Sequence, residues 1–122
     1  MAAAELLHRL SSAIDEHRWS DLPRLLHRDF RCRLVHTGET FDRDSWVRFN
    51  ADYPGFQRFE LQDCIAEHDR AAGRAHVTGL AEGDVQHFEV ASFLTVRDGL
   101  VVELIEVWTD VDVAVPTRTR PA

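Results

Sequence analysis

The chain has 122 residues and a mass of 14.0 kDa, which fits one domain and is too short for two full ones. Its formal net charge of −7 argues against a nucleic-acid groove and against an anionic membrane surface as partner. All 14 basic residues are arginine, so the composition excludes Schiff-base chemistry and a lysine nucleophile. No apolar run approaches the roughly 20 residues that a membrane span requires.

The start of the chain and its two cysteines predict a cytoplasmic protein. The opening segment MAAAELLHRL lacks the basic region and the continuous apolar run of a secretion signal. Cys32 and Cys64 are far apart and form no C-x-x-C pair. A disulfide between them is one interpretation, and two free thiols in a reducing compartment is the favoured one.

The first half of the chain is expected to be mainly helical. Apolar residues at helical spacing predict an amphipathic helix that ends near Arg18. These residues are Ala3, Leu6, Leu7, Leu10, Ala13 and Ile14. Ser20 is suited to cap a second, short helix that tolerates Pro23 in its first turn and runs to about His27.

A strand and a third helix follow. Phe30, Cys32, Leu34 and His36 alternate with arginines, which predicts a strand with one apolar face that ends at His36. Asp42 is the expected N-cap of the third helix. The Pro54-Gly55 pair stops that helix after Tyr53.

The rest of the chain predicts a meander of four strands, the last two joined at Asp98-Gly99, a strong hairpin signal. The expected strands are 59–68, 74–80, 86–96 and 100–111. Helices at the front and antiparallel strands at the back indicate the α+β class. We expect one domain over residues 1–112 and a loose tail over 113–122.

A two-residue loop at Asp98-Gly99 predicts the register of the last hairpin. One face would then hold Thr95/Val102, Phe93/Leu104, Ala91/Glu106, Glu89/Trp108 and His87/Asp110. A bulge would flip the partners on one strand. Neither face of the hairpin is clearly polar, and three short helices can cover only one, so a second copy of the chain is expected on the other as a homodimer.

Glu106 and Asp110 flank Trp108 on an otherwise apolar strand face. Burial raises the pKa of such a carboxyl, which makes it a candidate general base or acid. The alternative is that Glu106 pairs with Arg31 or Arg33 and only fixes the register.

Two histidines are candidate partners for these acids. His36 stands at the end of an apolar strand face, where an imidazole could shuttle protons, and the alternative is a rim histidine without a role. His87 would face Asp110 in the register above. The histidine and cysteine spacings match no metal motif, and no G-x-G-x-x-G or P-loop occurs, so neither a metal nor a cofactor is expected.

The element order, the segment N-A-D-Y-P-G and the ending D-G-L-V-V-E-L-I-E-V-W-T-D resemble the nuclear transport factor 2-like superfamily, in its SnoaL-like branch of small polyketide cyclases. The resemblance covers about residues 4–112. It implies a cone: a strongly bent, mostly antiparallel sheet around helices, with an apolar pocket between them and often a dimer. In the cyclases an acid on the last strand is the base. The family segment V-E-H-W-D aligns with residues 102–106, so Glu106 takes the place of that acid.

The steroid isomerases of the same fold place a pocket aromatic where Trp108 stands, but this chain departs from their other residues. Their base carboxylate closes the first strand, which here ends in Leu34, Val35 and His36. Their first-helix tyrosine is absent, because the single tyrosine, Tyr53, lies on the third helix. Their protonated aspartate on the penultimate strand falls at Ala91 and Ser92. Steroid isomerisation is therefore disfavoured.

Three functions stay open. The first is an enzyme that moves a proton on a small apolar molecule, with Glu106 as base and His36 or His87 as partner acid. The second is a binding module that uses the same pocket without chemistry, and the third is a dimeric interaction domain. The expected pocket walls are Trp108, Tyr53, Phe49, Leu34 and Phe93.

Overall fold

The computed structural model describes residues 1–120, and these form two α-helices, one 3-10 helix and six strands. The helices are α1 (Ala3–Asp15), the 3-10 helix η1 (Trp19–Leu25) and α2 (Arg43–Ala51). The strands are β1 (Leu26–Leu34), β2 (Thr40–Phe41), β3 (Phe56–Glu67), β4 (Arg70–Ala81), β5 (Asp84–Arg97) and β6 (Leu100–Asp110).

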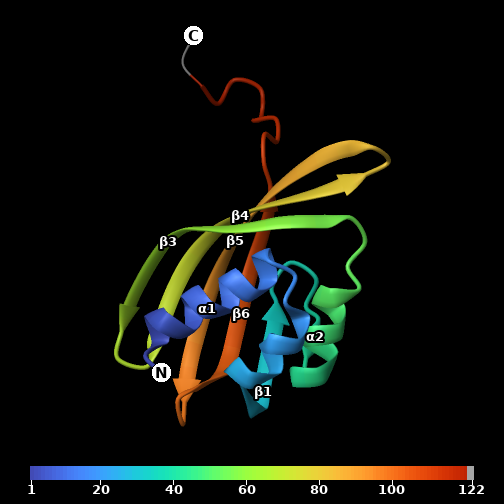
Figure 1. The fold of residues 1–122 in the computed structure, drawn as a ribbon. Coiled ribbons are helices and arrows are strands. Elements are labelled where there is room, and N and C mark those ends of the chain that lie inside the picture. The colour runs from blue at the N-terminus through green and yellow to red at the C-terminus, as the bar shows by residue number, and fades with distance from the viewer. Residues whose placement is uncertain (121–122) are drawn as a thin grey trace.

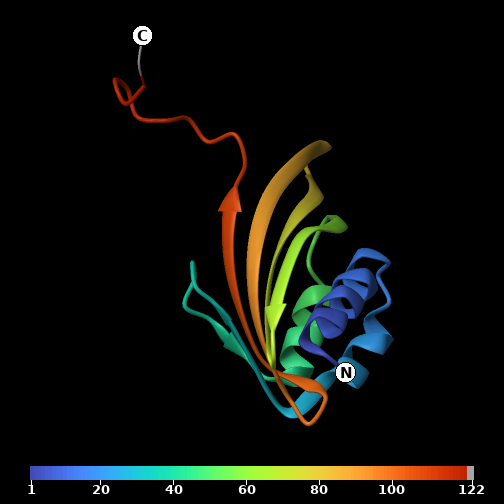
Figure 2. The same cartoon turned by 90° about the vertical axis from the view of Figure 1, so that its left-hand side faces the viewer.

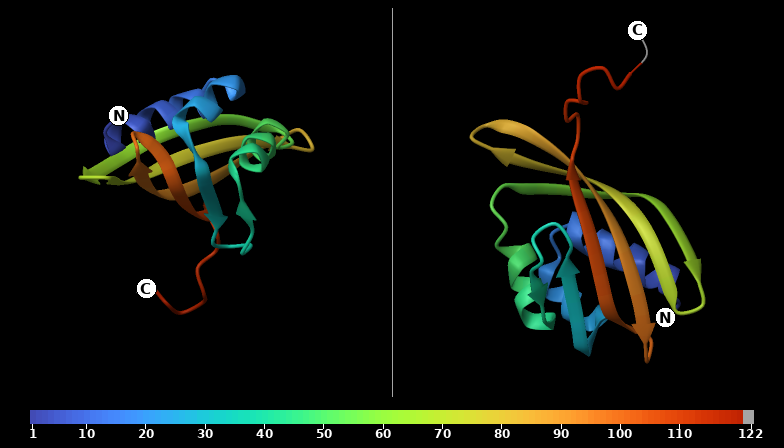
Figure 3. Two further views of the ribbon diagram at one scale, coloured as in Figure 1. Left: turned by 90° about the horizontal axis from the view of Figure 1, so that it is seen from below. Right: turned by 180° about the vertical axis from the view of Figure 1, so that it is seen from behind.

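The strands form one sheet in the order β2-β1-β6-β5-β4-β3. β1 runs parallel to β6, and every other neighbouring pair is antiparallel. The helices lie on one side of this curved sheet (Figures 1 and 2). The view from behind shows strands in front of the helices (Figure 3). The predicted α+β cone fold is confirmed.

The helices follow the predicted signals with shifted ends. The six apolar residues of the predicted stripe are all buried on α1, but the helix ends at Asp15 instead of Arg18. The chain reverses at His17, which has a φ of 56°. The second helix is a 3-10 helix with Pro23 inside it. Asp42 caps α2 as predicted: its side chain accepts a hydrogen bond from the Ser45 N–H at 2.9 Å.

The predicted strands are present, and the first of them is displaced. β1 begins at Leu26 and ends at Leu34, so His36 lies in the turn that leads to the short strand β2 and not on the strand itself. β2, which pairs with β1 at Cys32 and Arg33, was not predicted. Residues 113–120 of the predicted tail are outside the regular elements, and its last two residues lie outside the described part of the chain.

The predicted register of the β5–β6 hairpin is wrong beyond its first two pairs. Arg97 opposes Leu100 and Val96 opposes Val101, but Thr95 then opposes Glu103, which leaves Val102 as a one-residue bulge. Every later pair is offset by one residue. Phe88, and not His87, therefore lies opposite Asp110.

The core fills the space between the helices and the sheet face that they cover, called here the inner face. Its largest fully buried side chains include Trp46, Phe30, Leu6, Leu22, Leu26, Leu94 and Leu104. The opposite, outer face is not covered by any described element, and on it Phe93 and Val107 stay about two-fifths exposed. Among the described helices, none has both the length and the apolar character needed to cross a membrane.

Candidate functional site

A cavity of about 630 Å³ lies between α2 and the inner face of the sheet. Helical spacing places Phe49 and Asn50 on the face of α2 that lines it. Tyr53 lines it from the segment after the helix, because α2 ends at Ala51 and not, as predicted, after Tyr53. Strand alternation places Glu106 and Trp108 on the facing side of β6. The lining is mainly aromatic and aliphatic, with a few polar groups, as is typical of small-molecule sites.

Glu106 is a buried acid in this lining. Only 5% of its surface is exposed, and it lies opposite Leu34 on β1 and Ser92 on β5. Its Oε1 accepts a hydrogen bond from the Cys32 thiol at 3.5 Å. Burial raises the pKa of Glu106 to about 7, although the Cys32 thiol and the Trp46 indole act in the opposite direction.

The alternative that Glu106 pairs with an arginine is wrong for the described residues. Arg31 opposes Glu103 on β6, and its side chain donates to the Phe30 carbonyl. No salt bridge reaches Glu106 within residues 1–120. Its charged form therefore lacks a counterion, which is why desolvation dominates its pKa.

The cavity opens at His36, Asp110 and Tyr53, which are exposed residues that line it. His36 reaches this rim from the turn after β1, and Asp110 from the last residue of β6. His36 and Glu106 thus share one cavity, the first at its opening and the second in its buried part. The predicted walls Trp108, Tyr53, Phe49 and Leu34 also line it.

Two predicted site residues, His87 and Phe93, lie on the outer face. The bulge at Val102 shifts β5 against β6, so these side chains point away from the cavity. The predicted pairing of His87 with Asp110 is therefore wrong. His87 Nδ1 instead contacts His76 Nε2 at 3.0 Å.

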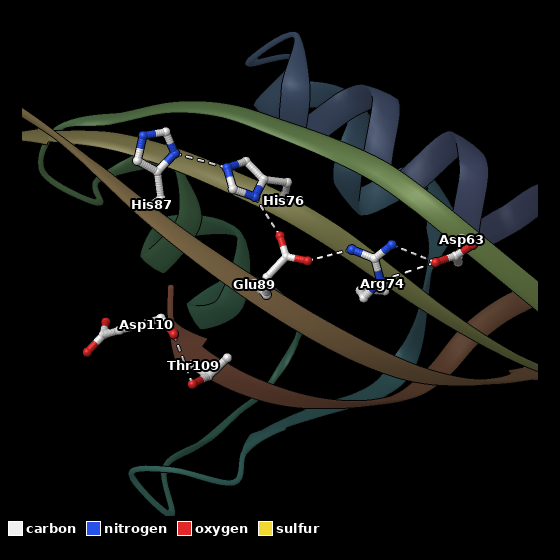
Figure 4. A network of polar contacts seen from close by, with 7 residues as sticks. All are labelled: Asp63, Arg74, His76, His87, Glu89, Thr109 and Asp110. Carbon is white, nitrogen blue, oxygen red and sulfur yellow. Dashed lines mark hydrogen bonds and ion pairs between the residues drawn. The ribbon is translucent and has the colours of Figure 1, made fainter. Parts of the chain in front are cut away.

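The outer-face network consists of Asp63, Arg74, Glu89, His76 and His87. His76 Nδ1 contacts Glu89 Oε2 at 2.6 Å, and Arg74 donates to both Glu89 and Asp63. Figure 4 shows these five side chains in a line across β3, β4 and β5, with Asp110 at a distance from them. His87 thus belongs to this line of polar contacts.

The sequence interpretation missed several residues that line the cavity or surround Glu106. Phe88 was placed on the wrong face by the register error, and Phe56 and Phe59 line the cavity from β3. Cys32 could have been found, because it alternates with Leu34 on the apolar face of the first strand. Trp46 packs on Phe30, with ring centroids 5.3 Å apart, and no sequence signal placed it beside Glu106.

The chemistry that this arrangement can carry is acid–base. Burial and the nearby Glu106 charge raise the pKa of the Cys32 thiol, so it stays protonated and is no nucleophile. Among residues 1–120, no three His, Cys, Asp or Glu side chains are grouped as metal ligands.

The profile of the SnoaL-like domain matches residues 7–104 of this sequence. The chain belongs to the SnoaL-like family. This confirms the resemblance to the SnoaL-like branch, and the matched segment ends at Leu104, before Glu106. One fold of this kind carries unrelated reactions, so the family by itself assigns none of them.

Solved structures agree with the fold. A candidate ketosteroid isomerase from Kribbella flavida DSM 17836 is 27% identical and superposes with a TM-score of 0.82, over 98% of this chain and 90% of that one. IdmH, a candidate polyketide cyclase from Streptomyces antibioticus, is 21% identical with a TM-score of 0.71, over 85% and 89%. An epoxide hydrolase of the LEH-like type from M. tuberculosis is 11% identical with a TM-score of 0.74, over 87% and 81%. No curated protein sequence matches the chain.

Proposed function

We propose that this protein catalyses a proton transfer on a small, mainly apolar molecule, with Glu106 as the general base. The observation that carries the proposal is a buried carboxyl without a counterion in the lining of an aromatic cavity. A base works best when its pKa lies near the working pH. With a pKa of about 7, Glu106 exists in both protonation states at neutral pH.

The reaction type follows from what one buried carboxylate can do. Ionised Glu106 removes a proton from a carbon next to a carbonyl group, and the C–H electron pair moves into the carbonyl to form an enolate. Return of that proton to another carbon completes an isomerisation. In a cyclisation the enolate carbon instead bonds to the carbon of a second carbonyl group, whose π electrons move to its oxygen, and that oxygen takes up the proton from Glu106. His36, at the exposed rim, is placed to exchange protons with solvent.

Among acid–base reactions, steroid isomerisation of the kind described above is the less favoured. The Kribbella protein is named for it, but here the carboxylate expected after β1 is replaced by Val35 and His36. On β5 the residue beside Glu106 is Ser92, not an acid. A dehydratase, hydrolase or cyclase reaction would instead use Glu106 together with His36, which line the same cavity.

The test compares two glutamates of β6. Glu106→Gln removes the proposed base, and the matched control Glu103→Gln makes the same change on an exposed residue of the same strand. A panel of cyclic ketones, epoxides and polyketide-like esters is screened for turnover. Glu106→Gln should lower turnover by about 10²- to 10⁴-fold and Glu103→Gln should leave it unchanged.

Two results would reject this proposal. Turnover that survives Glu106→Gln removes Glu106 from the mechanism. Ligands that bind equally to the wild-type protein and to Glu106→Gln, without turnover in either, identify a binding module instead.

We also propose that a second copy of the chain covers the outer face. The register aligns Ile65, Ala72, Phe93 and Ile105 in one row across four strands, and Ile65 is 76% exposed. An isologous dimer buries such a patch against its own copy. The two free thiols fit a reducing compartment, and we propose a cytoplasmic location.

Sedimentation tests the dimer. The wild-type protein should sediment as a dimer at micromolar concentration, and Phe93→Arg should convert it to a monomer. Val113→Arg, which places the same charge on an exposed valine outside the sheet, is the control. A wild-type monomer would contradict the proposal.

A further inference from the structure

Two donors lie behind the Glu106 carboxyl, and no cation of residues 1–120 forms an ion pair with it. The Cys32 thiol donates to Oε1 at 3.5 Å from the neighbouring strand β1. The Trp46 indole comes from α2 and is close enough to Glu106 to lower its pKa. Both side chains are buried, at 0% and 1% exposure, and neither is part of the cavity lining.

The Trp46 indole N–H is unsatisfied in this arrangement. Its Nε1 is the one buried side-chain nitrogen or oxygen within residues 1–120 that lacks a hydrogen-bond partner. A buried donor without a partner costs free energy, so such groups are rare in folded proteins. The acceptor beside this one is a carboxyl that changes charge near neutral pH.

We propose that Trp46 and Cys32 are positioning residues for Glu106: their N–H and S–H groups hold its carboxylate from behind and stabilise it when it ionises. This rests on the proposed role of Glu106 as the base. In the neutral acid, Oε1 keeps only the weak thiol bond. On ionisation the carboxylate becomes a strong acceptor, and a small movement brings it to the indole N–H.

This arrangement explains how a buried carboxyl can still ionise near neutral pH and act as a base. An arginine in place of the two donors would lower the pKa of Glu106 strongly. Without any donor, burial would raise the pKa so far that the carboxyl would stay protonated at neutral pH. Two weak, uncharged donors give an intermediate result and fix the direction of the carboxyl. Preorganised dipoles of this kind need no rearrangement of solvent during the reaction.

The surroundings of Glu106 contain few other groups that could produce the same effect. Cys32 is the titratable group that faces it from β1, and Ser92 from β5 is uncharged. Cavity-lining His36, Tyr53 and Asp110 are titratable but stand at the exposed rim. The Trp46 ring packs on Phe30, with ring centroids 5.3 Å apart, and its side chain is fully buried.

The experiment titrates Glu106 by NMR, with carboxyl-labelled glutamate and with ¹⁵N-labelled indoles. In the wild-type protein the Trp46 N–H signal should shift with the same midpoint as the Glu106 carboxyl, and that of Trp19 should not. Cys32→Ala and Trp46→Phe should each raise the pKa of Glu106, by about one pH unit. Cys32→Ser keeps a donor and should restore the wild-type midpoint.

Matched controls are available for both donors. Cys64→Ala and Trp19→Phe remove the other cysteine and another tryptophan, and both should leave the midpoint of Glu106 unchanged. If Trp46→Phe fails to fold, the cysteine pair and the wild-type indole titration still decide the question.

The proposal is overturned if Cys32→Ala leaves the midpoint in place or if the Trp46 signal does not follow Glu106. Its failure is separate from that of the proposed function. Midpoint shifts together with full turnover in Glu106→Gln would reject Glu106 as base and retain the two donors. If the Cys32 and Trp46 variants leave the midpoint unchanged while Glu106→Gln loses turnover, Glu106 is retained as the base and the role of the two donors is rejected.

Discussion

Glu106 and Glu89 lie on the neighbouring strands β6 and β5, on opposite faces of one sheet, and their carboxyl groups behave in opposite ways. Desolvation raises the pKa of Glu106 to about 7, because only an indole and a thiol oppose it. Desolvation also acts on Glu89, but hydrogen bonds from Arg74 and His76 outweigh it and its pKa is lowered. The two residues have the same chemistry, and their neighbours decide how each one titrates.

This difference gives the two faces of the sheet different roles, ion pairing on the outer face and proton exchange on the inner face. The outer-face network pairs its carboxylates with arginine and histidine, and these partners lower the pKa of Glu89, so it acts as a structural charge (Figure 4). The inner face leaves one carboxyl unpaired beside a cavity. Unpaired and buried acids are the ones that exchange protons near neutral pH.

The largest expected effect is the loss of stability when a buried side chain of the inner face is shortened, compared with an exposed one of the outer face. Leu94→Ala removes a fully buried side chain on the inner side of β5 and should cost about 2–5 kcal/mol of unfolding free energy. The adjacent Phe93→Ala removes a larger side chain from the outer face and should cost less than about 1 kcal/mol in the monomer. Urea unfolding measures both, and equal losses would contradict the assignment of the faces.

The second prediction concerns stability against pH. The pKa of Glu106 is about 7 in the folded state, whereas the ordinary pKa of a glutamate is 4.5. The stability that the bound proton contributes is therefore complete below pH 4.5 and is lost as the pH rises to 7. The loss is roughly 3 kcal/mol. Glu106→Gln should therefore stabilise the protein at pH 8 and change little at pH 4.5.

Glu89→Gln should show the opposite sign. Because the pKa of Glu89 is lowered, its contribution is present above its ordinary range and lost as the pH falls through its folded value. The variant should be slightly less stable than the wild type at pH 7 and equal to it in strong acid. Thermal unfolding over this pH range checks both signs, and parallel curves for the two variants would refute the comparison.

A smaller effect is expected at the helix that carries Trp46 to the inner face. Asp42→Ala removes the N-cap of α2 and its bond to the Ser45 N–H, and should cost about 1 kcal/mol. Asp44→Ala, in the first turn of the same helix, is the control and should cost only a few tenths of a kcal/mol. Denaturant unfolding distinguishes them, and a similar cost for both would argue against the cap.

The smallest effect is expected in the outer-face network. Asp63→Asn breaks the ion pair with Arg74, but both side chains are about half exposed or more, so the cost should be under about 1 kcal/mol. It should fall further in high salt. Urea unfolding of the monomeric Phe93→Arg variant measures this cost, and a loss of several kcal/mol there would contradict the exposure of the ion pair.

Local signals predicted most of the fold. The stripe on α1, the Asp42 cap and the Asp98-Gly99 turn all act within a few residues, and each appears in the structure. The family resemblance predicted that Glu106 points into the pocket, and strand alternation placed it on the same face as Trp108. In the structure both residues lie on the inner face. The short strand β2 was missed, because two residues are too few to show an alternating pattern and its pairing is with β1.

The candidate site was predicted in part. Glu106, Trp108, Asp110 and His36 share the cavity, but His87 and Phe93 do not. The cause is the single extra residue at Val102, since a one-residue shift in a strand moves its side chains to the other face. No local sequence pattern marks that bulge.

The sequence by itself determined the class of the protein, the order of its elements and the acid that lies inside, because hydrophobic periodicity and turn chemistry are local properties. The tertiary structure alone decided which partners surround that acid. Cys32 and Trp46 lie 74 and 60 positions away along the chain, and only the parallel pairing of β1 with β6 and the packing of α2 bring them to it. The pKa of a buried carboxyl depends on the groups within a few ångströms in space, and the fold selects those groups.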